Sequence, residues 1–217
     1  MITNRKMTLP MVRYQHKIER DDENYNVSTG RKKALKVIKN VRRSTLLIHR
    51  HQDNIKRLHD SLFEVAIKYA STGHVLFFTI KKVERVSDSA LSQFSDSFKN
   101  IVFFYIQSID KLLEKLIDLQ RWENCLPQMI IIESLDDMTN AEGVCQVSQH
   151  TSLMACLADT VKVISSKLES NCKCIVTMND VTYNEIPFEM FARESCVLNE
   201  ATLSGFTEIM SVLAEMT

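Results

Sequence analysis

Residues 128–138 read QMIIIESLDDM, an apolar run that stops at the carboxylate of Glu133 and continues into an acidic turn. A short apolar run between turn signals is typical of a strand that is buried on both faces of a parallel sheet. Glu133 would then lie at the carboxyl end of that strand, where ligands bind in open α/β sheets. The stretch therefore predicts one strand of an α/β protein, and it raises the question of whether the chain uses a nucleotide.

Several other short apolar segments have the same character, and helical patterns separate them. The strand-like segments cover residues 45–49, 74–80, 101–106, 172–178 and, as a further candidate, 195–199. Apolar residues recur at helical spacing over residues 53–70, 108–122, about 149–170 and 206–216. This alternation predicts an α/β fold with a doubly wound, mainly parallel sheet and helices on both of its faces.

The segment 108–122 is regular enough to predict which of its side chains face the sheet. Ser108 is the expected N-cap, because its hydroxyl can accept a hydrogen bond from a free N–H of the first turn. Asp110 suits the positive end of the helix dipole. The residues expected to face inward are Ile109, Leu112, Leu113, Leu116 and Ile117.

The charge of the chain is divided unevenly, although its net charge is zero. Residues 1–50 contain 13 Lys and Arg against 4 Asp and Glu, whereas residues 51–217 contain 14 against 23. We expect a basic N-terminal extension over residues 1–44, flexible at first and then an amphipathic helix, followed by a core domain over residues 45–217. A basic segment joined to an acidic body is typical of a protein that contacts a polyanion or an acidic partner.

The helical part of the extension carries a cationic face. Its members are Lys32, Lys33, Lys36, Lys39, Arg42 and Arg43. One interpretation is that these side chains contact DNA phosphates, with an affinity that falls as salt rises. The other is that they form a solvated helix face, while the apolar side of the helix packs on the core domain.

Composition argues against several other classes of protein. The six cysteines lie in mainly apolar contexts without a CxxC pair, so we expect free thiols in the core and no metal site. The amino terminus lacks the apolar region of a signal peptide. No apolar run approaches the length of about 18 residues that a membrane span needs. We therefore expect a protein of the cytosol or nucleus with no membrane partner.

The place where such folds carry a phosphate-binding loop has an unusual composition. The loop after the first strand normally reads GxxxxGK[ST], because glycine lets backbone N–H groups approach the phosphates. Residues 48–58 read IHRHQDNIKRL and contain no glycine. Lys56 falls near the position of the loop lysine, and Glu133 falls where a magnesium-binding aspartate is expected.

Lys56 and Glu133 together form what we interpret as a degenerate nucleotide site. Each also has a purely structural explanation, because lysine is common on an early helical turn and parallel strands often end in an acid as they leave the core. The sequence contains no GxSxG segment and no other catalytic signature. We expect no catalytic residue, no cofactor and no bound metal.

The order of these segments resembles that of the RecA-like recombinase paralogues. The resemblance is carried by TLLIH (45–49), GHVLFFTIKKVERV (73–86) and LPQMIIIESLDDM (126–138), followed by a long helix and CKCIVTMNDV (172–181). In that family an edge strand, a helix, the Walker B strand, a long helix and a strand with a Thr/Asn-containing turn follow one another.

Within the paralogues, the chain is most similar to the small RecA-like proteins of Shu complexes, which associate with a SWIM-domain protein. The matching positions are Val75–Phe77, Thr79, Lys81, Lys82 and Leu135–Asp137. Vertebrate members look as if they keep an intact GxxxxGK[ST], which this chain lacks, so the resemblance does not imply ATP hydrolysis here.

The resemblance implies a non-catalytic subunit of a recombination mediator complex in the nucleus. Such a subunit would form a heterodimer with a SWIM-type zinc-finger protein, bind single-stranded or forked DNA, and promote assembly of a RecA-type recombinase filament. The alternative is a RecA-like scaffold subunit of an Elongator-type accessory ring, whose members also lack phosphate loops and bind transfer RNA.

Overall fold

A computed structural model describes residues 44–50, 55–82, 96–138, 147–179, 191–192, 194–198 and 205–216. The cationic residues of the predicted extension, from Lys32 to Arg43, lie outside the described residues. The expected division into an extension and a core domain therefore stays a prediction.

The strands form one sheet of six members in the order β3-β2-β4-β5-β1-β6, and each pair of neighbours is parallel. The strands are β1 (Thr45–Arg50), β2 (His74–Thr79), β3 (Ile101–Tyr105), β4 (Pro127–Ile132), β5 (Lys173–Asn179) and β6 (Glu194–Leu198). The helices are α2 (Ile55–Ala70), α4 (Ile109–Leu119), α5 (Val147–Leu168) and α7 (Gly205–Glu215), with a 3-10 turn η2 (Leu135–Asp137). Each strand and helix predicted over residues 45–217 is present, including the last strand, whereas the amphipathic helix predicted for the extension lies outside the described residues.

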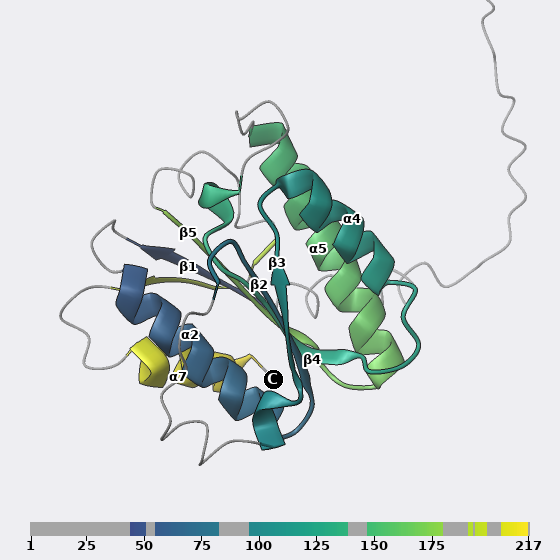
Figure 1. Ribbon diagram of the computed structural model, residues 1–217, viewed down its shortest axis with the longest axis horizontal. Helices are drawn as coiled ribbons and strands as arrows, with labels where there is room; N and C mark the ends of the chain where they lie inside the picture. The colour runs from purple at the N-terminus through teal and green to yellow at the C-terminus, as the bar shows by residue number, and fades with distance from the viewer. Residues whose placement is uncertain are drawn as a thin grey trace, which may run out of the picture.

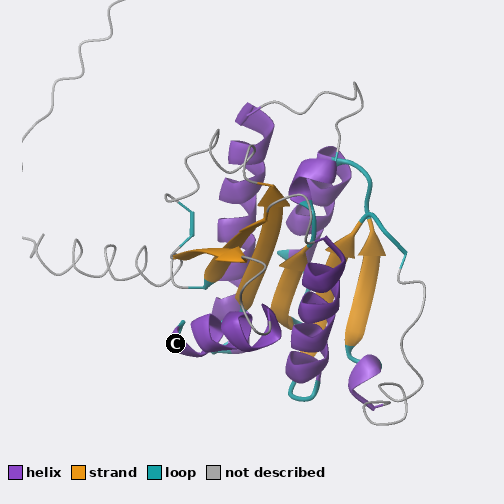
Figure 2. Ribbon diagram, turned by 90° about the vertical axis from the view of Figure 1, so that its left-hand side faces the viewer, coloured by secondary structure: helices purple, strands orange, loops and turns teal. Residues whose placement is uncertain are grey.

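The two directions in which the chain crosses the sheet explain why both faces are covered. The step from β1 to β2 runs toward the β3 edge, whereas the steps from β3 to β4 and from β4 to β5 run back toward β6. Right-handed crossovers in opposite directions place their helices on opposite faces. Accordingly α2 packs beside α7 on one face and α4 beside α5 on the other (Figure 1), while the strands lie side by side between them (Figure 2). This arrangement confirms the α/β class and is consistent with a RecA-like doubly wound fold.

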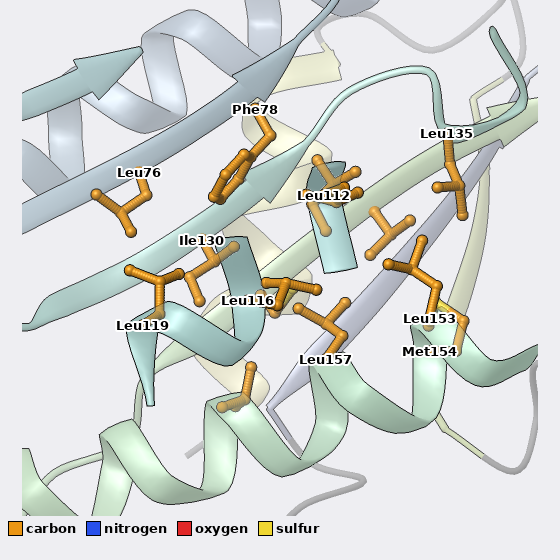
Figure 3. Packing of buried hydrophobic residues seen from close by; sticks show 14 of the residues in the cluster. Leu76, Phe78, Leu112, Leu116, Leu119, Ile130, Leu135, Leu153, Met154 and Leu157 are labelled. Atoms are coloured by element: carbon orange, nitrogen blue, oxygen red, sulfur yellow. The ribbon is translucent and has the colours of Figure 1, made fainter. Parts of the chain in front are cut away.

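The core has two halves because successive strand side chains alternate between the faces. In β4, Met129 and Ile131 pack toward α2 and α7, whereas Ile130 and Ile132 pack toward α4 and α5. Figure 3 shows Ile130 close to Leu116 of α4 on the second side. Full burial of one such side chain stabilises the fold by about 1.5–3 kcal/mol. A strand that faces apolar layers on both sides is apolar on both sides, which is why Met129–Ile132 shows no alternation of apolar and polar residues.

The predicted N-cap of α4 is confirmed, but one of the residues predicted to face inward is exposed. The Oγ of Ser108 accepts a hydrogen bond from the backbone N–H of Lys111 at 3.4 Å, as expected of an N-cap. Ile117 does not face inward, however: it is 48% exposed, and Leu113 is half-buried. The buried stripe comprises Ile109, Leu112, Leu116 and Leu119. The helix turns this narrower stripe toward α5 and the sheet, so Ile117, about 100° round the helix from Leu116, lies beyond the contact.

The cysteines and the long helices give two further outcomes. Cys172 and Cys174 are buried free thiols, as predicted, but Cys125 is exposed and Cys156 is half-buried. Burial raises the pKa of Cys172 to about 12, which keeps that thiol protonated and unreactive at neutral pH. Among the described helices, none is both long and apolar enough to span a membrane.

Candidate functional site

The candidate site lies at the carboxyl end of the sheet. Because the strands are parallel, the carboxyl ends of β2, β4 and β5 lie at the same end. Thr79 is the last residue of β2, and Glu133 follows β4 directly. Two-residue alternation places Thr79 on the same face as Phe77, and Glu133 on the same face as Ile131. Both polar side chains therefore belong to the face that α2 covers.

His59, from the second turn of α2, completes a group of three side chains that we call the carboxylate cluster: His59, Thr79 and Glu133. The Nδ1 atom of His59 lies 2.7 Å from Oε1 of Glu133. The hydroxyl of Thr79 donates to Oε2 of the same carboxylate, also at 2.7 Å. Glu133 is only 4% exposed, so both of its oxygens are bound by protein groups inside the fold.

The cluster favours the charged forms of both Glu133 and His59. Burial raises the pKa of Glu133, but the hydrogen bonds from His59 and Thr79 outweigh it, and the pKa falls below its ordinary value. The hydrogen bond to Glu133 raises the pKa of His59 above its ordinary value, against the opposing effect of desolvation. Each partner thus stabilises the charged form of the other.

Backbone groups around the cluster fix its position. The N–H of Lys81 donates to Oγ1 of Thr79 at 3.2 Å, which orients that hydroxyl. Ser134 has a left-handed backbone with φ of 54°, and its N–H donates to Oγ1 of Thr177 at 2.8 Å. This turn directs the chain away from the strand immediately after Glu133.

A second link ties the turn after β4 to the end of β5. One oxygen of Asp136 accepts a hydrogen bond from the backbone N–H of Asn179 at 3.0 Å, and the other accepts from its side-chain amide at 2.9 Å. Glu133 and Asp136 are therefore both held by donors of the protein itself.

This arrangement determines what the site can do chemically. Each oxygen of Glu133 already accepts a short hydrogen bond, so a Mg²⁺ ion at this carboxylate would compete with His59 and Thr79 for its lone pairs. Within the described part of the chain, no three His, Cys, Asp or Glu side chains are grouped in a way that could hold a metal. The geometry favours a site that presents a histidine over one that coordinates a cation.

The structure places only part of the residue set predicted from the sequence. Glu133 lies where the strand pattern put it, at the carboxyl end of β4. Lys56 lies in the first turn of α2, but its side chain is outside the described residues, as is the cationic face of the extension.

Sequence reasoning did not identify His59 as a partner of Glu133. The two are 74 positions apart, and they meet only because α2 crosses the sheet above β2 and β4. The sequence offered one signal for this role: His59 is a polar residue beside the apolar stripe of α2, one turn after the start of the helix. Thr79 was named for its resemblance to a family position and not as part of a site.

Comparisons with family models and with curated proteins identify no relative of this chain. No model of a known protein family matches this chain, and no curated protein is significantly similar to it. The fold and the carboxylate cluster are therefore the observations on which its function must be judged.

Proposed function

We propose that this protein is a non-catalytic RecA-like subunit of a nuclear, Shu-type recombination mediator complex that binds DNA. The observation that carries the proposal is the carboxylate cluster. A RecA-like ATPase needs the carboxylate after this strand to serve magnesium and nucleotide, and here His59 and Thr79 bind both of its oxygens. The carboxylate of Glu133 lies where a RecA-like ATPase carries its magnesium-binding group, but it is hydrogen-bonded to His59 and Thr79.

The sequence of the β1–α2 connection supports the same proposal. Residues 49–58 contain no glycine, so every residue there has a Cβ that opposes the left-handed turns of a phosphate cradle. The absence of glycine in this stretch of sequence and the internal use of the carboxylate are independent features, and each disfavours nucleotide turnover. Both features support a proposed role in recognition of other macromolecules.

The proposed partners follow from the resemblance and from the charge distribution. The cationic face of the extension (Lys32, Lys33, Lys36, Lys39, Arg42 and Arg43) is proposed to contact single-stranded or forked DNA. The core domain is proposed to pair with a SWIM-type zinc-finger protein, and the complex to assist a RecA-type recombinase.

Titration with DNA and with nucleotide tests the proposal directly. Fluorescence anisotropy with a labelled single-stranded oligonucleotide should show binding that weakens steeply with salt. Binding should fall further in a variant with Lys32, Lys36, Lys39 and Arg43 changed to alanine. A matched control replaces four exposed cations of the core domain, namely Lys68, Lys99, Arg121 and Lys162. Equal loss in the two variants would assign the effect to net charge and contradict a specific role for the extension.

Nucleotide binding and assembly provide the remaining outcomes. A fluorescent ATP analogue should show no saturable binding, and tight binding that is lost in Glu133→Ala would contradict a non-catalytic role. A one-to-one complex with a SWIM-type protein on a sizing column would support the recombination proposal. A ring of six subunits would favour the Elongator-type alternative.

A further inference from the structure

We propose that His59, Lys81 and Lys82 form a contact for the phosphate groups of a DNA strand at the carboxyl end of the sheet. This inference rests on the DNA-binding function proposed above. It adds to the basic extension a second contact, on the core domain itself, that can be tested separately.

The orientation of His59 is the first step. Its Nδ1 atom is bound to Glu133 at 2.7 Å, and the two nitrogens of an imidazole point in different directions, so Nε2 points away from the buried carboxylate. The side chain of His59 is 25% exposed, so part of the ring is accessible to solvent. An imidazole paired with a buried carboxylate stays protonated more readily, and its second N–H is then a charge-assisted donor.

Lys81 and Lys82 supply further positive charge beside this donor. The hydrogen bond from the N–H of Lys81 to Thr79 fixes the start of the turn in which both lysines stand. Both side chains are exposed, and Lys81 is close enough to interact electrostatically with His59 and Glu133. Within the described residues no ion pair links either lysine to a carboxylate.

Helix α2 favours an anion at the same end of the sheet. The helix follows β1, so its amino end and the positive pole of its dipole lie near the carboxyl ends of the strands. Its first turn contains no acidic residue. Among the described carboxylates nearby, Glu133 and Asp136 accept hydrogen bonds from His59 and Asn179. Asp60 and Asp137 are exposed, and their charge opposes an anion.

The absence of a glycine-rich sequence after β1 favours the phosphates of a DNA backbone over those of a nucleotide. A triphosphate in such a fold is surrounded by backbone N–H groups of a glycine-rich loop, and residues 49–58 contain no glycine. A DNA backbone is held by separate donors along its phosphates, many of them Arg, Lys and other polar side chains. Separate donors from a helix and a turn fit a passing strand better than a nucleotide.

The experiment measures binding of the full-length protein to a labelled oligothymidylate by fluorescence anisotropy at several salt concentrations. We expect His59→Gln and Lys81→Ala each to weaken binding about fivefold and to lower the salt dependence by about one phosphate contact. Asp60→Asn should strengthen binding, because it removes an opposing charge. Matched controls are His74→Gln and Lys68→Ala, at the amino end of β2 and in the last turn of α2, which should bind as the wild type does.

The variants separate a contact with DNA from a loss of folding. Lys81→Ala removes only an exposed side chain and leaves the carboxylate cluster intact, so a weaker complex in that variant cannot come from unfolding. Wild-type affinity in Lys81→Ala and Lys82→Ala, together with loss in the variant of the extension, would overturn this inference and leave the proposed function standing. No DNA binding by the wild type would end both. Displacement of the oligonucleotide by ATP that depends on His59 would assign the contact to nucleotide and overturn the inference.

Discussion

Replacement of His59 by alanine tests the carboxylate cluster through the stability of the fold. The change leaves the carboxylate of Glu133 buried with Thr79 as its remaining side-chain donor, 2.7 Å away. An exposed ion pair contributes up to about 1 kcal/mol, whereas breaking a fully buried pair costs about 3–5 kcal/mol. His59 is 25% exposed and Glu133 is nearly buried, so we expect a loss of about 2 kcal/mol in the free energy of unfolding, typical of a hydrogen bond to a charged group.

The pH dependence of that loss is the sharper part of the prediction. The pKa of His59 is raised above 6.5, so its contribution is complete below that pH and is lost as pH rises through the folded value. The pKa of Glu133 is lowered below 4.5, so its contribution is complete above that pH and is lost as pH falls through the folded value. The difference between wild type and His59→Ala should therefore be largest between pH 4.5 and 6.5.

Urea denaturation followed by the fluorescence of the single tryptophan, Trp122, measures this difference at each pH. His74→Ala is the matched control, because it removes a histidine from the opposite end of β2. A loss for His59→Ala that stays constant from acid to alkaline pH would refute an ion pair and reduce His59 to a packing residue.

Three further predictions concern the cluster, the core and the thiols. Thr79→Val should destabilise the fold by about 1–2 kcal/mol in urea denaturation and raise the pKa of Glu133 in a carboxyl NMR titration, because it removes a donor to the charged form. Leu116→Ala should cost about 2–5 kcal/mol, whereas Ile117→Ala should stay within about 0.5 kcal/mol; equal losses would contradict the burial assigned to α4. Mass mapping of a thiol reagent should find Cys125 labelled in the native protein and the buried thiols at the start of β5 labelled only after unfolding; fast native labelling at β5 would show that this strand opens readily.

Sequence patterns predicted most of the fold, because the central strands β2, β4 and β5 are buried on both faces. The edge strand β3 is the exception: it was expected to be buried like the others, but Val102 and Tyr105 are exposed. A strand such as β4 is apolar throughout, so its place in the sequence is visible without knowledge of its neighbours. The order of the strands in the sheet was not predicted, since it depends on which helix covers which face. The prediction that Ile117 faces inward was wrong for a related reason. Periodicity defines an apolar side of α4, but it does not define how far around the helix the contact extends.

The candidate site was predictable only where it depends on a single segment. Glu133 could be placed because one strand delivers it to the carboxyl end of the sheet. Its engagement by His59 depends on the crossing of α2 over two strands that are distant in sequence, and no local spacing encodes that crossing. For the side chains of the extension, the charge is evident in the sequence, but their surroundings lie outside the described residues.

The carboxylate cluster also allows the cost of nucleotide binding to be worked out. A magnesium–nucleotide complex that took both oxygens of Glu133 would displace His59 and Thr79, whose two charge-assisted hydrogen bonds contribute about 1.5–3 kcal/mol each. Micromolar binding corresponds to about 8 kcal/mol, so a loss of about 3–6 kcal/mol would weaken it more than a hundredfold before the missing glycines are considered. Removal of either donor alone returns only part of this energy. A gain of ATP affinity in a His59→Ala, Thr79→Val double variant that reaches the sum of the two single gains would therefore show that the cluster itself keeps nucleotide out.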